Sequence, residues 1–315
     1  MNPISIPLIV LTWNSGAKLR EWLTTVKALN APKGHVIRPV IVDNASSDIT
    51  PAIIGEAVSN GQVLPEDVHL LPSNFGFAKA HNIVFRHLII HTSCRFVATL
   101  NEDATADPGW LASLVDAASE SSPESRIGMW SGPIYCPSPR QNIISSAGHW
   151  LRQRDGAFLD IDWNKPAASD NRSSKPDFRP FCPCFAASLW SLDMMKKVGL
   201  PDSDQFMYYD DVDLGYHARL DGWDAQYVDA AHAFHPLPKP QANSSLMRKH
   251  QDKGRLSIVC RYLPDQERVR ILSELPENLR LTYSEMLWER RRLEPVETPD
   301  RRLTIWKEWA WVRGE

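Results

Sequence analysis

Long apolar runs are missing from this sequence of 315 residues. No stretch approaches the ~20 consecutive apolar residues that a membrane-spanning helix needs. The N-terminal segment also lacks the basic region, the apolar region and the small-residue cleavage site that together mark a secretory signal peptide. We therefore expect a protein of the cytoplasm.

The sequence also has few cysteines and a small net charge. The five cysteines are an odd number and lie scattered, so they predict no disulfide framework. Cys182 and Cys184 form a C-x-C pair, but no second pair stands at the spacing of a zinc site. The net charge of −3 argues against a chain built to bind nucleic acid.

Strand-like and helix-like segments alternate between Ile6 and Val115. Apolar residues at helical spacing fill residues 19–29 and 77–91, and a further helix follows Pro108. This alternation predicts an α/β fold, in which a mostly parallel sheet is covered by helices on both faces. The predicted strands are continuous apolar runs at residues 8–11, 37–42, 68–71 and 96–100.

The middle of the chain is less regular. Residues 137–180 are rich in Ser, Pro, Asn and Asp, and they predict long loops around a weak strand or hairpin. Helices are expected over 191–198 and from Asp211 to Gly222, and a strand over 226–234.

The composition changes after residue 240, where the chain becomes mostly helical and rich in Arg and Trp. We therefore expect one α/β domain over residues 1–240, with halves of about 1–125 and 126–240, and a C-terminal helical extension over 241–315. A basic, aromatic stretch over 301–315 ends the chain. Two interpretations remain open for it: contact with an anionic membrane surface, or packing of a helix on its own domain.

Polar residues follow the predicted strands where ligands of open α/β sheets bind, outside the carboxyl ends of the strands. One of them, Asp103, offers the hard oxygen ligand that suits Mg²⁺ or Mn²⁺, and such an ion can bridge two phosphates. Capping of the following helix is the competing explanation for this carboxylate. The residues at these strand ends are Thr12, Asn14, Asp43, Asn44, Asn101 and Asp103.

Three carboxylates, Asp210, Asp211 and Asp213, stand at the start of one predicted helix, where the helix dipole favours negative charge. The aromatic residues just before them would bury at least one. Burial and neighbouring negative charge raise a carboxyl pKa towards that of a useful general base. The spacing alone does not decide which of the three is the base.

Two histidines, His232 and His235, flank a predicted strand end. At a separation of three residues in a strand they face opposite sides, so at most one is expected to point into the site. A histidine beside a carboxylate shifts the metal preference from Mg²⁺ towards Mn²⁺. A purely structural pair of histidines is the alternative.

The order of these pieces resembles the family 2 glycosyltransferases, and especially their rhamnosyltransferase-like branch. The resemblance covers roughly residues 5–265. Each piece is modest, but six in this order and spacing form a specific pattern. The matching stretches are "IVLTWNSGAKLREWLTTVKAL", "VIVDNASSD", "LPSNFGFAKAHN", "LNEDATADPGWL", "QFMYYDDVDLGYHARLDGWDAQYVDAAHAFH" and "KGRLSIVCRYLP".

The resemblance implies a GT-A fold, which joins a Rossmann-like nucleotide-binding sheet to an acceptor region. It also implies that Asp43 pairs with the pyrimidine base, with Asn44 beside it. The full set of nucleotide-side residues that it implies is Thr12, Asn14, Asp43, Asn44, Asn74, Gly76, Asn82, Asn101 and Glu102.

The resemblance further implies a metal motif at residues 101–103, in which Asn stands where the strict Asp-x-Asp pattern has its first Asp. Asp103 remains the implied ligand of Mn²⁺ or Mg²⁺, together with the late histidine His235. In the family's acidic pair the second member is the base, which selects Asp211. His217 stands where an Arg is common, so the resemblance supports no diphosphate contact there.

The implied reaction is an inverting transfer of a sugar from a nucleotide diphosphate to a hydroxyl. L-Rhamnose carried on dTDP is the first expectation for the donor, and UDP-galactofuranose, UDP-glucose and UDP-N-acetylglucosamine stay open. The expected acceptor is a saccharide of a growing surface polysaccharide, and a lipid-linked saccharide is one form that it could take. A homodimer contact is expected, if anywhere, on the C-terminal helices.

Three rival functions fit the sequence less well. A nucleotidyltransferase would show a Gly- and Arg-rich loop after the first strand, where this chain has "TWNSGAK". A non-catalytic sugar-nucleotide binder would lack the base or the metal ligand, and both are present. A processive polymerase would carry transmembrane helices and a Gln-x-x-Arg-Trp motif, and the sequence has neither.

Overall fold

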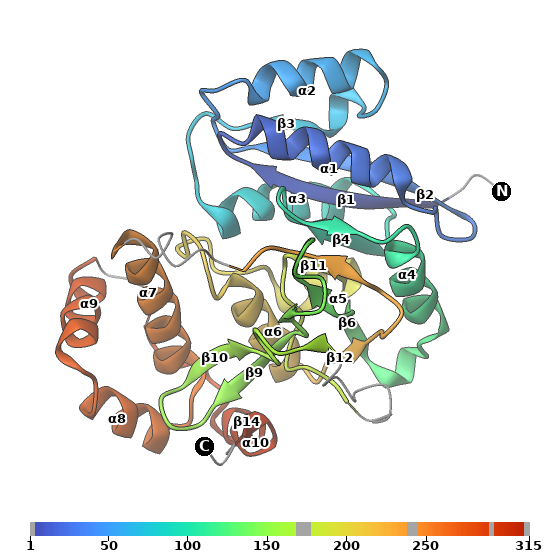
Figure 1. Ribbon diagram of the computed structural model, residues 1–315. Helices are drawn as coiled ribbons and strands as arrows, with labels where there is room; N and C mark the ends of the chain where they lie inside the picture. The colour runs from blue at the N-terminus through green and yellow to red at the C-terminus, as the bar shows by residue number, and fades with distance from the viewer. Residues whose placement is uncertain (1–3, 168–177, 238–244, 290–292, 312–315) are drawn as a thin grey trace.

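A computed structural model describes residues 4–167, 178–237, 245–289 and 293–311. At its centre lies a seven-stranded sheet with the strand order β12-β6-β11-β4-β1-β2-β3 (Figure 1). Only β11 runs antiparallel to its neighbours in this sheet, so the expected mostly parallel sheet is confirmed. The strands are β1 (Ile4–Thr12), β2 (His35–Asp43), β3 (Val68–Leu70), β4 (Phe96–Leu100), β6 (Ile127–Ser131), β11 (Ala187–Ser191) and β12 (Asp224–Tyr227).

Helices cover both faces of the sheet because successive strand residues point to opposite sides. On β1, Leu8 and Val10 belong to one buried apolar cluster, whereas Ile9 belongs to the other. The first cluster also holds apolar side chains of α1 (Gly16–Ala28), α2 (Thr50–Ser59) and α4 (Trp110–Glu120). The second holds those of α3 (Phe77–His91), α5 (Leu192–Val198) and α6 (Asp210–Leu220).

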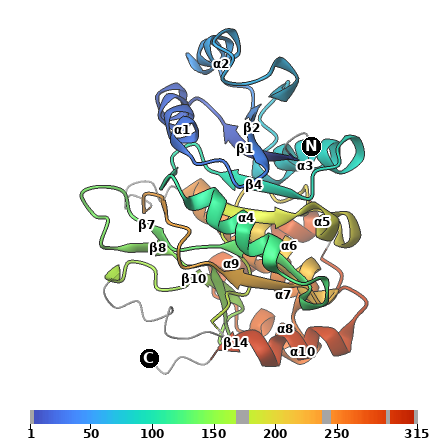
Figure 2. The same cartoon turned by 90° about the vertical axis from the view of Figure 1, so that its right-hand side faces the viewer.

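Two small sheets accompany the central sheet (Figure 2). The expected hairpin between residues 137 and 180 is present as the antiparallel pair β9 (His149–Arg152) and β10 (Ala157–Asp160). Strand β14 (Ala310–Trp311) adds to its edge beside β9. The second small sheet contains β5 (Thr105–Ala106), β13 (Ala233–Phe234), β7 (Ile134–Tyr135) and β8 (Ile144–Ser146).

The single strand expected over residues 226–234 is wrong. The chain forms β12 and then β13, and these strands belong to different sheets. A tight turn separates them, in which the Ala231 amide donates to the Val228 carbonyl over 3.0 Å. Gly132 permits this turn to approach, since a Cβ at that position would lie only 2.0 Å from the Ala231 carbonyl oxygen.

Helices dominate the C-terminal part of the chain, as the sequence predicts. They are α7 (Ser245–Tyr262), α8 (Asp265–Ser273), α9 (Glu277–Trp288) and α10 (Pro299–Trp309), and Figure 1 shows them gathered beside α6 and the β9–β10 hairpin. The tyrosine rings of α6 and α7 stack, with the centroids of Tyr216 and Tyr262 4.6 Å apart. Among the described helices, none is long and apolar enough to cross a bilayer.

The basic, aromatic stretch at the C-terminus packs on its own domain over the part that the structure describes. Arg302 is 4% exposed, and its guanidinium donates to the Leu263 carbonyl over 2.7 Å. Trp306 is 5% exposed, and the Arg219 guanidinium lies 4.1 Å from the centre of the Trp309 ring. These contacts agree with the second interpretation, in which a helix packs on its own domain. Residues 312–315 lie outside the described residues.

Candidate active site

The loops after β1 and β2 are tied together at the carboxyl end of the sheet. Asn14 has a positive φ of 52° and accepts a hydrogen bond from the Ser47 amide over 2.8 Å. Its own amide donates to the Ser46 hydroxyl over 2.9 Å, and that hydroxyl donates to Asp43. Thr12 is fully buried at the end of β1. The predicted residues at these two strand ends therefore form one rigid edge.

Asn44 extends this edge to the loop before α3. Its side-chain amide donates to the Asn74 oxygen over 2.8 Å, and its own oxygen accepts from the Phe75 amide over 2.8 Å. Gly76 follows with a φ of +78°, and a Cβ there would lie 2.3 Å from the Phe206 carbonyl oxygen. Only glycine fits both the backbone angle and this close approach.

Asn82 does not share this edge. It is 1% exposed, and its amide donates to the Pro201 carbonyl over 2.6 Å and to the Ser203 hydroxyl over 3.0 Å. The residue therefore fastens α3 to the loop that precedes α6. The implied position of Asn82 near a base or ribose finds no support in this arrangement.

Asp103 and His235 come together at the end of β4. The Oδ1 atom of Asp103 lies 3.2 Å from Nε2 of His235, and its Oδ2 atom accepts from the Lys18 ammonium over 3.2 Å. Burial alone would raise the pKa of this carboxyl, but the hydrogen bond and charge of His235 and the charge of Lys18 hold it well below its usual range. Asp103 is thus an ionised carboxylate next to an imidazole.

The other two residues of the expected metal motif differ in their contacts. Glu102 braces the loop after β1, because its carboxylate accepts from the Ser15 hydroxyl over 2.6 Å and from the Trp13 amide over 3.3 Å. Burial raises the pKa of Glu102. Asn101 is half-buried, and its backbone amide donates to the Ala186 carbonyl over 2.9 Å.

The other two histidines considered in the sequence analysis, His232 and His217, do not contact Asp103 among the described contacts. The His232 ring pairs with the Asp107 carboxylate over 3.2 Å, so one of the two late histidines contacts Asp103 and the other does not. This agrees with the expectation that they face opposite sides. His217 lies edge-on to Tyr262, with its Nε2 atom 3.8 Å from Asp213. Its ring therefore faces α7.

The three carboxylates at the start of α6 have three different environments. Asp213 is fully buried and accepts from the Tyr262 hydroxyl over 2.6 Å, from Arg261 over 3.0 Å and from the Asp202 amide over 2.8 Å. This carboxylate therefore fastens α7 to α6. Asp210 is 4% exposed, and burial together with the charge of Asp211 raises its pKa well above the ordinary value.

The backbone before α6 is strained. Tyr208 and Tyr209 have positive φ angles of 67° and 64°, a region that bulky residues rarely adopt. Such strain persists only where the surrounding structure enforces it, and it concentrates at functional sites. Here the two residues turn the chain directly into Asp210 and Asp211.

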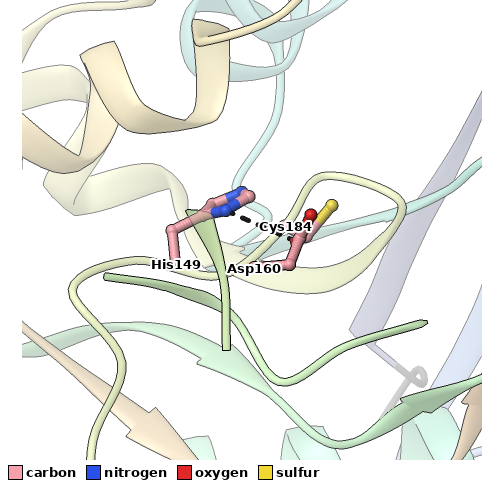
Figure 3. Close-up of side chains that lie close together, drawn as sticks. All are labelled: His149, Asp160 and Cys184. Carbon is pink, nitrogen blue, oxygen red and sulfur yellow. Dashed lines mark ion pairs between the residues drawn. The ribbon is translucent and has the colours of Figure 1, made fainter. Parts of the chain in front are cut away.

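Asp211 has a partner that the sequence did not reveal. Its Oδ2 atom lies 2.9 Å from Nε2 of His149 and also accepts from the Phe185 amide over 3.2 Å. Nδ1 of the same imidazole lies 3.5 Å from Asp160, and Cys184 completes the cluster (Figure 3). Only the register of the β9–β10 hairpin could have pointed to His149, and the sequence pattern left that region as loops.

Comparison with known proteins gives this geometry a context. Residues 8–177 match the family described as Glycosyl transferase family 2. The chain is 26% identical over 247 residues to an N-acetylglucosaminyl-diphospho-decaprenol L-rhamnosyltransferase of Mycobacterium tuberculosis, and the match covers 73% of this chain and 75% of that protein.

Solved structures share the fold at low sequence identity. One is a mannosyltransferase of Pyrobaculum calidifontis in complex with GDP-Man and Mn²⁺, with a TM-score of 0.54, 17% identity, and coverage of 90% of this chain and 69% of that chain. Another is GalNAc-T7 with UDP, GalNAc and Mn²⁺, with a TM-score of 0.63, 14% identity, and coverage of 90% and 54%. The GT-A fold that the sequence resemblance implies is therefore confirmed.

Proposed function

The chain belongs to glycosyl transferase family 2, and from this premise we propose that it transfers a sugar from a nucleotide diphosphate to an acceptor hydroxyl, with inversion and with the help of a divalent metal ion. The contact between Asp103 and His235, 3.2 Å long at the carboxyl edge of the sheet, carries the proposal. Ligands of open α/β sheets bind at this edge.

The donor is a nucleotide sugar in this proposal. Similar structures hold GDP-Man or UDP, which supports a nucleotide sugar as the donor. In this chain the buried carboxylate of Asp43 would accept the N3–H group of uracil or thymine. The joined loops around Asn14, Asn44 and Asn74 would form the wall of the nucleotide site, with Thr12 buried beneath them.

The donor set at Asp103 and His235 suits a divalent ion. A carboxylate oxygen and an imidazole nitrogen within contact distance match the ligand preferences of Mn²⁺, and Mg²⁺ remains an option through the carboxylate. A metal ion bound there would supply neutralisation of the charge that develops on the leaving diphosphate. Lys18 adds a positive charge on the other oxygen of Asp103.

Asp211 is the general base of the proposal. It accepts the proton of the acceptor hydroxyl, and the hydroxyl oxygen bonds to the anomeric carbon as the bond to the diphosphate breaks on the opposite face. The nucleoside diphosphate leaves with the bonding electrons, and no covalent enzyme intermediate is needed. Asp211 is only 9% exposed, so water has little access to it before the acceptor binds.

The substrate proposals follow the relative. Its name gives L-rhamnose as the sugar and an N-acetylglucosaminyl-diphospho-decaprenol as the acceptor. We extend both as classes, with dTDP-rhamnose as the first donor and a lipid-linked saccharide of surface polysaccharide synthesis as the acceptor. We assign the donor to residues 1–125 and the acceptor to residues 126–240. The extension expected over residues 241–315 would offer, on helices α7 to α10, the surface for a homodimer.

Product analysis tests this function. The purified protein is incubated with Mn²⁺, single nucleotide sugars and a lipid-linked N-acetylglucosaminyl diphosphate, and the product is examined by mass spectrometry and NMR. The proposal expects one glycosidic bond with the anomeric configuration opposite to that of the donor. Retention of the donor configuration would contradict the assigned role of Asp211. An unchanged acceptor with every donor would contradict the substrate classes.

A further inference from the structure

The imidazole of His149 is held between two carboxylates by the register of the β9–β10 hairpin. His149 and Asp160 are directly opposite each other across this antiparallel pair, so their side chains share one face. On its other side, the His149 backbone pairs with Cys182, over 2.9 Å from the His149 amide to the Cys182 carbonyl. Figure 3 shows the ring pointing towards Asp160 and Cys184. Both strand neighbours therefore fix the His149 backbone, and the hairpin register places its ring beside Asp160.

The Nε2 atom of the His149 ring contacts Asp211, the second member of the acidic pair Asp210 and Asp211 at the start of α6. Nε2 lies 2.9 Å from Oδ2 of Asp211, and the two side chains are only 12% and 13% exposed. Two amides complete the shell of Asp211: Phe185 donates to Oδ2 over 3.2 Å and Val212 to Oδ1 over 2.9 Å. A carboxylate with three donors in so buried a position has a single orientation.

Within the described part of the chain, Asp210 shows no such set of donors, and it lies next to Asp211 at the same buried helix end. Two adjacent buried carboxylates do not both ionise readily, because each charge opposes the other. The position of a cation therefore decides which of them carries the proton. His149 contacts Asp211, and Asp160 lies on the far side of the ring from that contact.

We propose that His149, held by Asp160, is a positioning residue that keeps Asp211 as the ionised, correctly aimed member of the acidic pair and leaves the proton of the pair on Asp210. This inference rests on the proposed function, in which Asp211 accepts the proton of the acceptor hydroxyl. The proton transferred in each turnover goes to Asp211 and then to solvent, so His149 neither gains nor loses a proton in the reaction.

The pKa directions agree with this geometry. Burial lowers the pKa of His149, but the charges of Asp211 and Asp160 and the hydrogen bonds to Asp211 and Cys184 raise it well above 6.5 overall. Burial raises the pKa of Asp211, but His149 and the backbone donors lower it overall. Other titratable groups also face this cluster from the packed elements: Cys182, Cys184 and Tyr209 near His149, Asp210 beside Asp211, and His235 near Asp160.

Imidazole NMR tests the ion pair without any substrate. The full chain is labelled with ¹⁵N-histidine, and the signal that disappears in His149→Gln is assigned to His149. We expect this ring to stay doubly protonated above neutral pH in the wild type. In Asp211→Asn its pKa should fall by about one to three units, because an opposite charge in contact is removed. A ring that titrates at or below pH 6.5, or is unchanged by Asp211→Asn, overturns the inference.

The pH profile of transfer tests the role of the ion pair. Glutamine at position 149 keeps a hydrogen-bond donor but no charge, so the acidic limb of kcat/KM should move up by about one to three pH units while the rate at high pH recovers. A merely structural loss would lower the rate equally at every pH. The control is His217→Gln, which changes a histidine of α6 that faces Asp213 rather than Asp211. If the acidic limb of kcat/KM lies at the same pH in His149→Gln as in the wild type, the inference is overturned.

The two measurements separate this inference from the proposed function. Failure of the wild type to transfer any sugar contradicts the proposed function, whereas the NMR titration still decides the ion pair. A metal ion could instead bind His149, Asp160 and Cys184, whose ligand atoms lie within 4.8 Å of one another. Elemental analysis of the purified protein detects that case. One equivalent of zinc that is lost in His149→Gln would overturn the ion pair.

Discussion

Oδ1 of Asp103 lies 3.2 Å from Nε2 of His235, although one residue follows β4 and the other follows β13. The antiparallel pairing of β5 with β13 produces this contact, because it places Phe234 opposite Thr105, close behind Asp103. The small sheet therefore places the His235 imidazole at the carboxyl edge of the seven-stranded sheet. This relationship between two distant residues is the basis of the proposed metal site.

Loss of this carboxylate is expected to abolish metal dependence. Asp103→Asn should lower the transfer rate by about 10²-fold or more, because the metal's electrostatic contribution of several kcal/mol is lost. Removal of metal from the wild type with EDTA should have a similar effect, and added Mn²⁺ should restore only the wild type. The measurement is the initial rate against the Mn²⁺ concentration.

A matched control for this prediction is Asp107→Asn. Asp107 also pairs with a histidine, His232, over 3.2 Å, but this pair does not include the proposed metal ligands. Its metal dependence should therefore equal that of the wild type. An Asp103→Asn variant that still responds to Mn²⁺ in the same concentration range would exclude Asp103 as a ligand.

Substitution of the proposed base should separate binding from chemistry. Asp211→Asn is expected to bind the donor as the wild type does and to lose about 10²- to 10⁴-fold in kcat, the usual contribution of a general base. Asp210→Asn should lose much less, since an amide resembles a protonated carboxyl. Single-turnover rates and donor titrations measure the two effects. Turnover of Asp211→Asn close to that of the wild type would remove the residue from this role.

The third carboxylate of α6 should matter for stability rather than for chemistry. Asp213→Ala leaves Arg261 with Asp202 as its remaining carboxylate and deprives the buried Tyr262 hydroxyl of its acceptor, so the free energy of unfolding should fall by about 3–5 kcal/mol. Tyr262→Phe removes one hydrogen bond to a charged group and should cost about 1.5–3 kcal/mol. Urea unfolding measures both. A loss below about 1 kcal/mol for Asp213→Ala, the size of one neutral hydrogen bond, would contradict the fastening role.

The stability contributed by His149 should depend on pH in a defined direction. Because its pKa in the folded chain is raised above 6.5, its stabilisation is fully present below pH 6.5 and is lost as the pH rises through the folded-state value. The difference in unfolding free energy between the wild type and His149→Gln should therefore shrink above neutral pH. Urea unfolding at a series of pH values from 6 upward measures it, with ~0.5 pH-unit steps. A difference that grows with pH would show the opposite sign.

Regular elements could be predicted from the sequence where one pattern dominates. Helix α3 and strand β4 lie over the residues expected, because their apolar spacing is unbroken. The strand expected over residues 226–234 failed for a tertiary reason: a turn held close to Gly132 divides it between two sheets. Apolar patterning contains no information about such a contact.

Only the site residues that lie at the ends of the predicted strands could be predicted from the sequence. Asp103 and Asp43 follow continuous apolar strands, which places them at the ligand edge. The partner of Asp211 was missed because His149 lies on a short hairpin inside an irregular segment, where no periodicity assigns a face. Nor could spacing distinguish Asp211 from Asp213, which differ in what packs against them from β9 and from α7.

The most direct test of the central claim is thermal unfolding of the purified chain with UDP- and dTDP-sugars, each with and without Mn²⁺. We expect one nucleotide sugar to raise the melting temperature, and we expect this rise to require the metal. At 100 times the dissociation constant, binding to the folded state adds about 2.7 kcal/mol of stability. The rise should be absent in Asp103→Asn. A folded wild-type chain whose melting temperature no nucleotide sugar changes, with or without Mn²⁺, would contradict the account.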